Sequence, residues 1–68
     1  MSTIEPQPRL SLVMPAFNEE GTIATALERC LAESFVLEVI VVDDGSTDKT
    51  VVILEGMDDP RLRVIQHP

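Results

Sequence analysis

Two adjacent carboxylates, Asp43 and Asp44, directly follow the aliphatic run Val39 to Val42. Four such residues in a row predict a strand of a parallel sheet that helices cover on both faces. Ligands of open α/β sheets bind beyond the carboxyl ends of the strands, so both acids are expected where a ligand would be met. Carboxylates accept hydrogen bonds, and the imide N–H of a base and ribose hydroxyls can donate them. The pattern therefore predicts a site that binds a nucleoside.

The elements needed to position these acids alternate along the chain. Strands are expected at residues 9–14, 37–42 and 61–66, and helices at about residues 18–34 and 47–56. The first helix has one apolar stripe, formed by Ile23, Leu27, Cys30 and Leu31. Because right-handed crossovers join such units, the order predicts one parallel layer. The expected fold class is α/β, a three-layer Rossmann-like βαβαβ parallel sheet.

Capping residues are expected at the start of each helix. Asn18 suits the N-cap of the first helix, with Glu19 and Glu20 in its first turn, where they favour the helix dipole. Gly45 allows a sharp reversal after the central strand. The next three residues, Ser46, Thr47 and Asp48, are then expected to cap the second helix.

Length and cysteine content limit how such a layer can be stabilised. The chain has 68 residues and one cysteine, so it cannot form an internal disulfide, and a core of this size is small. Residues 1–8 are expected to be a flexible leader, and residues 9–68 an incomplete domain. A fragment of a larger domain and a chain that self-associates both fit these observations.

The charge balance excludes some partners. Twelve acidic and five basic residues give a net charge of −7, which argues against nucleic acid or an anionic membrane surface as partner. The sequence has no apolar run approaching the roughly 18 residues of a membrane helix and no signal-peptide pattern. The expected localisation is cytoplasmic.

Phosphate-binding loops are absent from the sequence. No G-x-G-x-x-G follows the first strand, and no G-x-x-x-x-G-K-S/T occurs. Both expected helix starts carry acids, which would repel a diphosphate that lacks a cation. His67 has no second His or Cys at a metal-ligand spacing, so no metal site is expected in this chain. The predicted site therefore contacts the nucleoside and leaves the diphosphate to a metal held elsewhere.

Two segments, residues 12–20 and 38–48, resemble the opening of family 2 glycosyltransferases with the GT-A fold. They read L-V-M-P-A-F-N-E-E and E-V-I-V-V-D-D-G-S-T-D, and the likeness extends from about Arg9 to His67. The P-A-F-N-E-E form most resembles the polyprenol (dolichol) phosphate sugar transferases. Such enzymes transfer a sugar from a nucleotide donor, usually UDP or GDP, to an acceptor. The resemblance implies a donor-binding N-terminal part of a GT-A domain.

The resemblance also suggests roles for individual residues. Those expected to contact the nucleotide sugar are Pro15, Ala16, Phe17, Glu19, Val42, Asp43 and Asp44. The first three resemble the loop against the base, with Phe17 at the usual tyrosine position. Glu19 resembles an acid that reaches the nucleoside, and Asp44 the acceptor of a hydrogen bond from the base. Asp43 is balanced between a site residue and a carboxylate that braces the neighbouring loop.

The family's D-x-D metal motif and catalytic base have no counterpart here. The resemblance implies Mg²⁺ or Mn²⁺ for the complete domain, a lipid phosphate or saccharide as acceptor, and in the complete protein a place on the cytoplasmic face of a membrane. No catalytic residue is expected in this chain, and alone it is expected to be inactive.

Two other classes fit the sequence less well. A receiver-type phosphoacceptor module also needs acids after the first strand, and Met14-Pro15-Ala16 supplies none. A non-catalytic α/β module that self-associates through its sheet edges stays open as the alternative.

Overall fold

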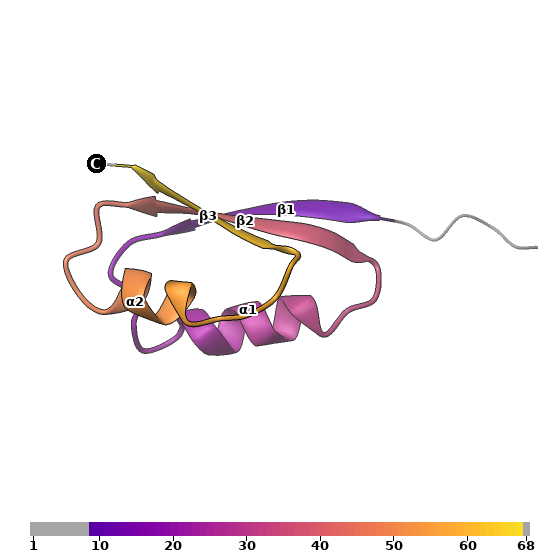
Figure 1. Cartoon of the computed structure of the whole chain (residues 1–68), viewed down its shortest axis with the longest axis horizontal. Coiled ribbons are helices and arrows are strands. Elements are labelled where there is room, and N and C mark those ends of the chain that lie inside the picture. The colour runs from indigo at the N-terminus through magenta and orange to yellow at the C-terminus, as the bar shows by residue number, and fades with distance from the viewer. Residues whose placement is uncertain (1–8, 68) are drawn as a thin grey trace, which may run out of the picture.

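The computed structural model describes residues 9–67 and contains three strands that alternate with two helices (Figure 1). The elements are β1 (Leu10–Ala16), α1 (Ile23–Leu31), β2 (Val36–Asp44), α2 (Thr50–Glu55) and β3 (Leu62–His67). The predicted βαβαβ order is confirmed. The expected leader, residues 1–8, lies outside the described residues, and so does Pro68.

All three strands are parallel, in the order β1-β2-β3. The register pairs Ala16 with Asp43 on one side of β2 and Asp43 with Gln66 on the other. The carboxyl ends of the strands therefore meet at one edge of the sheet. One irregularity lies at the opposite end of the β1–β2 pair, where Leu10 pairs with Val36 and Ser11 with Glu38. The bulge leaves the site-bearing ends of the strands in regular register.

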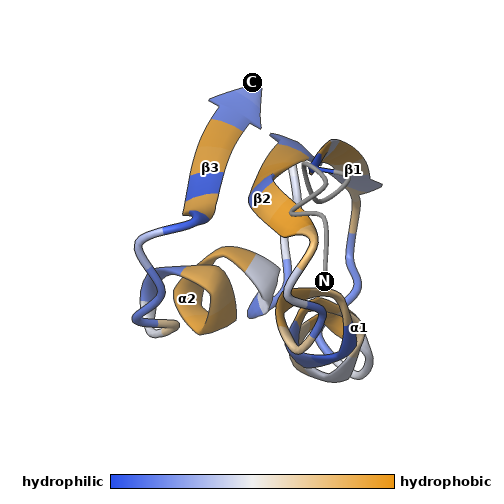
Figure 2. Ribbon diagram, turned by 90° about the vertical axis from the view of Figure 1, so that its right-hand side faces the viewer, coloured by the Kyte–Doolittle hydropathy of each residue, from blue (hydrophilic) through white to orange (hydrophobic). Residues whose placement is uncertain are grey.

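Both helices lie on the same side of the sheet (Figure 1 and Figure 2). The two crossovers step in the same direction across the sheet, so a shared hand puts their helices on one face. The core fills the space between the sheet and this helical layer. Its buried members are Ala16, Ile23, Leu27, Val36, Val39, Val41 and Leu54. Residues 9–67 thus contribute two layers of the predicted three-layer arrangement.

The opposite face of the sheet is uncovered within the described residues. Side chains alternate along a strand, so Val39 and Val41 are buried against the helices while Ile40 and Val42 are only partly buried. On this open face Val13 in β1 keeps 67% of its surface exposed. Burial of both faces, which the aliphatic run predicted, is therefore only partial.

Both helices begin later than predicted. α1 begins at Ile23 after Thr22, and Asn18, the predicted N-cap, instead adopts a left-handed backbone conformation with φ 51°. α2 begins at Thr50 after Lys49, and neither helix has a hydrogen bond from its N-cap side chain. The predicted capping roles of Asn18, Ser46 and Thr47 are wrong. Asp48 lies one position before the N-cap, Lys49, and its side chain does accept a hydrogen bond from the N–H of Thr50, the first residue of α2.

Arg61 joins three parts of the fold far from the acidic edge. Its guanidinium donates to the carbonyl oxygens of Leu31 (2.6 Å) and Val36 (3.3 Å), and to the carboxylate of Asp59. It thereby holds the end of α1, the start of β2 and the turn before β3 together. The hydrogen bonds with Arg61 lower the pKa of Asp59. Asp59 therefore belongs to this junction, and its ionised form is stabilised there.

Among residues 9–67, no helix is long and apolar enough to cross a membrane.

Candidate functional site

The loop after β1 lies against the loop after β2, and hydrogen bonds join them. Three consecutive backbone amides of the first loop donate to side chains of the second loop and of the first residue of α2. Asn18 N–H donates to Ser46 Oγ (2.9 Å), Glu19 N–H to Thr50 Oγ1 (2.8 Å) and Glu20 N–H to Asp48 Oδ2 (3.2 Å). The first loop is therefore fixed by side chains about thirty positions further along the chain.

The Asn18 side chain returns hydrogen bonds in the opposite direction. Its Oδ1 accepts from the backbone N–H of Thr47 (2.8 Å) and of Asp48 (3.3 Å). Asn18 therefore bonds the second loop through its backbone and through its side chain. The two loops form one hydrogen-bonded unit at the carboxyl edge of the sheet.

Asp48 accepts hydrogen bonds from both sides of this unit, from the Glu20 N–H and the Thr50 N–H. Partial burial acts to raise its pKa, but hydrogen bonds from the Thr50 hydroxyl and from the Thr50 and Glu20 N–H groups outweigh that effect. The pKa of Asp48 is therefore lowered below its ordinary value. The ionised carboxylate is the form that these donors stabilise.

Acidification is expected to destabilise the chain by protonating Asp48 and Asp59. Both carboxyl groups have lowered pKa values in the folded state. Their stabilising contribution is complete above the unfolded-state value of about 3.9 and is lost as pH falls through the folded-state pKa values. Thermal unfolding followed by circular dichroism from pH 7 to pH 2.5 should show a falling midpoint below about pH 4. The Asp48→Asn variant should show a shallower fall, and an unchanged slope would contradict this account.

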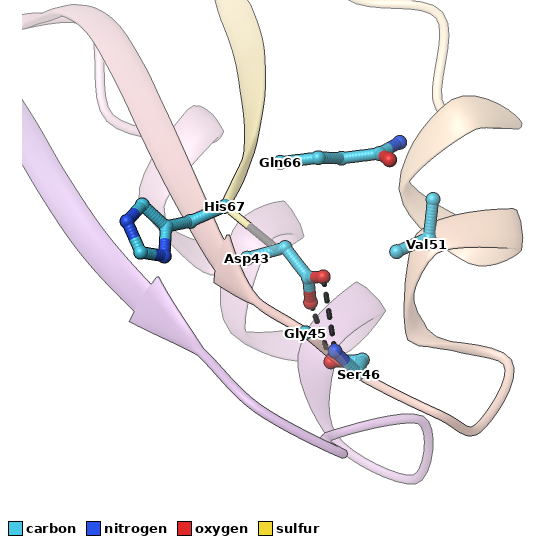
Figure 3. A pocket seen from close by; sticks show the side chains of 6 residues that line it. All are labelled: Asp43, Gly45, Ser46, Val51, Gln66 and His67. Carbon is cyan, nitrogen blue, oxygen red and sulfur yellow. Dashed lines mark hydrogen bonds between the residues drawn. The ribbon is translucent and has the colours of Figure 1, made fainter.

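Asp43 is buried, with 3% of its surface exposed, and accepts hydrogen bonds from Ser46. The Ser46 N–H donates to Oδ2 (3.1 Å) and the Ser46 hydroxyl to Oδ1 (Figure 3). Asp43 therefore braces the second loop, one of the two roles that the sequence left open for it. It also borders a cavity of about 270 Å³, lined by Asp43, Gly45, Ser46, Val51, Gln66 and His67.

Asp44 lies on the opposite, uncovered face of the sheet. Its side chain is 74% exposed, and its Oδ1 lies 3.4 Å from His67 Nδ1 on the neighbouring strand. In Figure 3 the His67 ring points away from Asp43 and Gln66. The adjacent acids therefore face opposite sides of the sheet, so one ligand on one face would not contact both carboxylates.

The other predicted site residues are divided between exposed and buried positions. Phe17 is 55% exposed and Glu19 is exposed, with the Glu19 carboxylate accepting from Thr22 Oγ1 (3.1 Å). Pro15 and Val42 pair in register on the open face, whereas Ala16 is buried in the core. The structure brings these residues to one edge, and only Asp43 of the predicted set lines the cavity. Their contact with a nucleoside stays a prediction.

Sequence reasoning did not identify Gln66 or the interloop role of Asn18. Gln66 lies beside Asp43 because the two residues pair across β2 and β3. The only sign of this in the sequence was the position of Gln66 at the end of the last expected strand. The Asn18 hydrogen bonds had no local signal, since their partners lie 28 to 30 positions away.

A metal site does not emerge at this edge. Among residues 9–67, no group of three His, Cys, Asp or Glu side chains is arranged to hold a metal ion. The expected Mg²⁺ or Mn²⁺ therefore has no donor set in the described part of the chain.

Comparison with known proteins agrees with this arrangement of parallel strands and edge loops. The family model "Glycosyl transferase family 2" matches residues 11–68. The chain belongs to this family. The resemblance seen in its two motifs is thereby confirmed.

Relatives within the family include lipid-phosphate sugar transferases. The chain is 41% identical over 63 residues to the succinoglycan biosynthesis protein ExoO of Rhizobium meliloti, covering 91% of this chain and 18% of that protein. It is 42% identical over 60 residues to a dolichyl-phosphate beta-glucosyltransferase of Drosophila melanogaster, covering 75% and 18%. It is 37% identical over 62 residues to an undecaprenyl-phosphate 4-deoxy-4-formamido-L-arabinose transferase of Photorhabdus laumondii, covering 84% and 19%.

The chain therefore spans less than a quarter of the length of the relatives described above. No solved structure matches it.

Proposed function

We propose that this chain supplies the donor-nucleoside part of a family 2 glycosyltransferase, whose donor is a UDP- or GDP-sugar. The observation that carries the proposal is the joined pair of loops at the carboxyl edge of the parallel sheet. This edge is where open α/β sheets bind ligands. It presents an exposed aromatic ring, Phe17, and an exposed carboxylate, Asp44.

The chemistry of the edge favours a nucleoside over a bare diphosphate. Glu19, Glu20 and Asp44 are all exposed there, and carboxylates repel phosphate while accepting hydrogen bonds from imide and hydroxyl donors. Phe17 offers an apolar ring surface against which a base can pack. The diphosphate and its divalent cation, Mg²⁺ or Mn²⁺, belong to the remainder of a complete domain in this proposal.

The acceptor proposed for the complete enzyme is a polyprenyl phosphate. Two of the relatives carry a dolichyl or undecaprenyl phosphate in their names, and both align with most of this chain. In this proposal residues 1–68 act as a fragment, which contributes the nucleoside site and lacks the groups that transfer the sugar.

Titration with UDP and with GDP tests the nucleoside site. Backbone amide shifts are expected to cluster in residues 15–19 and 42–45, with millimolar affinity for one of the two nucleotides. Asp44→Ala should weaken that binding about tenfold, because it removes a charged acceptor worth about 1.5 kcal/mol or more.

Asp58→Ala is the matched control. Asp58 is an exposed acid in the turn before β3, so this variant makes the same change in charge away from the carboxyl edge. It should bind as the wild type does. Equal affinities for all three chains would refute the assignment of Asp44.

Self-association is the second candidate function, and the uncovered sheet favours it. β1 and β3 each have an edge that no other strand within residues 9–67 pairs with, and the open face exposes Val13 and Ile65. Unpaired edges can template pairing with another chain. Size-exclusion chromatography with light scattering decides: a stable dimer that binds neither nucleotide would favour the structural module.

A further inference from the structure

Asn18 joins the two edge loops through both its backbone and its side chain. Its N–H donates to Ser46 Oγ, and its Oδ1 accepts from the N–H groups of Thr47 and Asp48. The residue itself is exposed and contributes nothing to the buried core. Its contacts therefore act on the loops and not on the packing of the sheet.

The backbone of Asn18 also requires a particular kind of residue. Its φ of 51° lies in the left-handed region, where among the described residues only Gly45 joins it. Asparagine enters this region more readily than most residues with a side chain. Glycine would adopt the same backbone without the Oδ1 acceptor, and alanine would supply neither property.

The proposed nucleoside contacts of the first loop, Phe17 and Glu19, depend on this junction for their positions. Phe17 directly precedes Asn18, and Asp44 lies two positions before Ser46. Asp44 is the last residue of β2 and is held by the sheet, whereas Phe17 and Glu19 follow the end of β1 and are exposed. The hydrogen bonds between the two loops therefore set the position of Phe17 and Glu19 relative to the end of β2.

We propose that Asn18 is a positioning residue that fixes the loop of Phe17 and Glu19 against the loop that follows Asp44 before a nucleoside binds. This inference rests on the proposed function. It adds a role for Asn18, which is not among the residues proposed to contact the nucleoside. A preformed site binds more tightly because less loop ordering opposes association. Loss of the junction should therefore reduce affinity while the sheet stays folded.

Three substitutions separate the two properties of Asn18. Asn18→Ala removes the acceptor and disfavours the left-handed backbone, and it should weaken binding of the preferred nucleotide about tenfold. Asn18→Gly keeps the backbone and should weaken binding about threefold. Asn18→Asp keeps an Oδ acceptor and tolerance of the left-handed region, and it should recover affinity to within about twofold of the wild type.

The measurements are nucleotide titrations by NMR, with hydrogen exchange of the Thr47 and Asp48 amides and a urea unfolding curve for each variant. Both amides should exchange faster in Asn18→Ala and Asn18→Gly, under conditions where the chain is fully folded. Gly21→Ala is the control in the same loop, because a Cβ added at Gly21 would meet no atom within 4 Å. It should leave affinity and exchange unchanged.

Two failures can be told apart. Wild-type chain that binds one nucleotide, together with an Asn18→Ala variant that binds it equally well, would overturn the positioning role alone. Wild-type chain that binds neither UDP nor GDP would overturn the proposed function, and the positioning role with it. Weakened binding without rescue by Asn18→Asp would also count against the proposed role of the acceptor.

Discussion

Replacing Leu27 with alanine is expected to lower the free energy of unfolding by about 3 kcal/mol, the cost of deleting a buried leucine side chain. Leu27 has no exposed surface and lies in the layer between α1 and the sheet. A single core in a chain of this size rarely supplies more than about 3–5 kcal/mol. The substitution should therefore leave much of the population unfolded at 25 °C.

Leu37→Ala is the matched control for this prediction. The Leu37→Ala substitution removes the same atoms from a side chain of β2, but 49% of the surface of Leu37 is exposed. Its substitution should cost less than about 1 kcal/mol, because little apolar area returns to water. Urea unfolding curves at pH 7 measure both values. Equal losses for the two variants would mean that the core does not lie where the structure places it.

The order of the elements could be predicted because each depends on a local pattern. Ile23, Leu27, Cys30 and Leu31 repeat at helical spacing, and the aliphatic run before Asp43 is typical of a strand. The structure contains both elements. Neighbouring residues carry this information, so the sequence alone was sufficient for the fold class.

Helix starts could not be predicted in the same way, because long-range contacts decide them. Glu19 and Glu20 suit a first helical turn. In the structure their amides donate instead to Thr50 and Asp48, which lie 31 and 28 positions further along the chain. Because the side chains of Thr50 and Asp48 accept hydrogen bonds from those amides, no N-cap side chain nearby in the sequence is needed to do so. These partners cannot be identified from the residues near the start of the helix.

The division of Asp43 and Asp44 between two faces did have a signal in the sequence. Side chains alternate along a strand, so Asp43 shares a face with Val39 and Val41 if the strand continues through the acids. The strand was predicted to stop at Val42 and in fact extends to Asp44. Because the strand continues through both acids, Asp43 is buried and braces the second loop, whereas Asp44 is exposed on the other face.

Thr50 is the first residue of α2, and its hydroxyl is part of the loop junction. Thr50 has no exposed surface, and its Oγ1 accepts from the Glu19 N–H and donates to Asp48. Thr50 lies one helical turn before Leu54, the other buried residue of α2, so both side chains face the core. A polar side chain is tolerated at this buried position because its hydroxyl is hydrogen-bonded to Glu19 and Asp48.

Thr50→Val should lower the free energy of unfolding by about 2 kcal/mol, since it leaves a partly buried N–H without its acceptor. The shape of the side chain is nearly retained, so the loss would come from the hydroxyl. Thr50→Ser keeps that hydroxyl and should recover most of the loss. Thr25→Val makes the same change at an exposed position of α1 and should stay within about 0.5 kcal/mol of the wild type.

The Glu19 amide distinguishes this cause from a general loss of packing. If the hydroxyl is the acceptor that holds the first loop, that amide should exchange faster in Thr50→Val, while the amides of β2 remain protected. Uniformly faster exchange in both regions would instead indicate that Thr50 stabilises the core as a whole. Protection confined to β2 would mean that the fold survives when the edge loops separate, and that the geometry of the site is set by a few hydrogen bonds beyond the core.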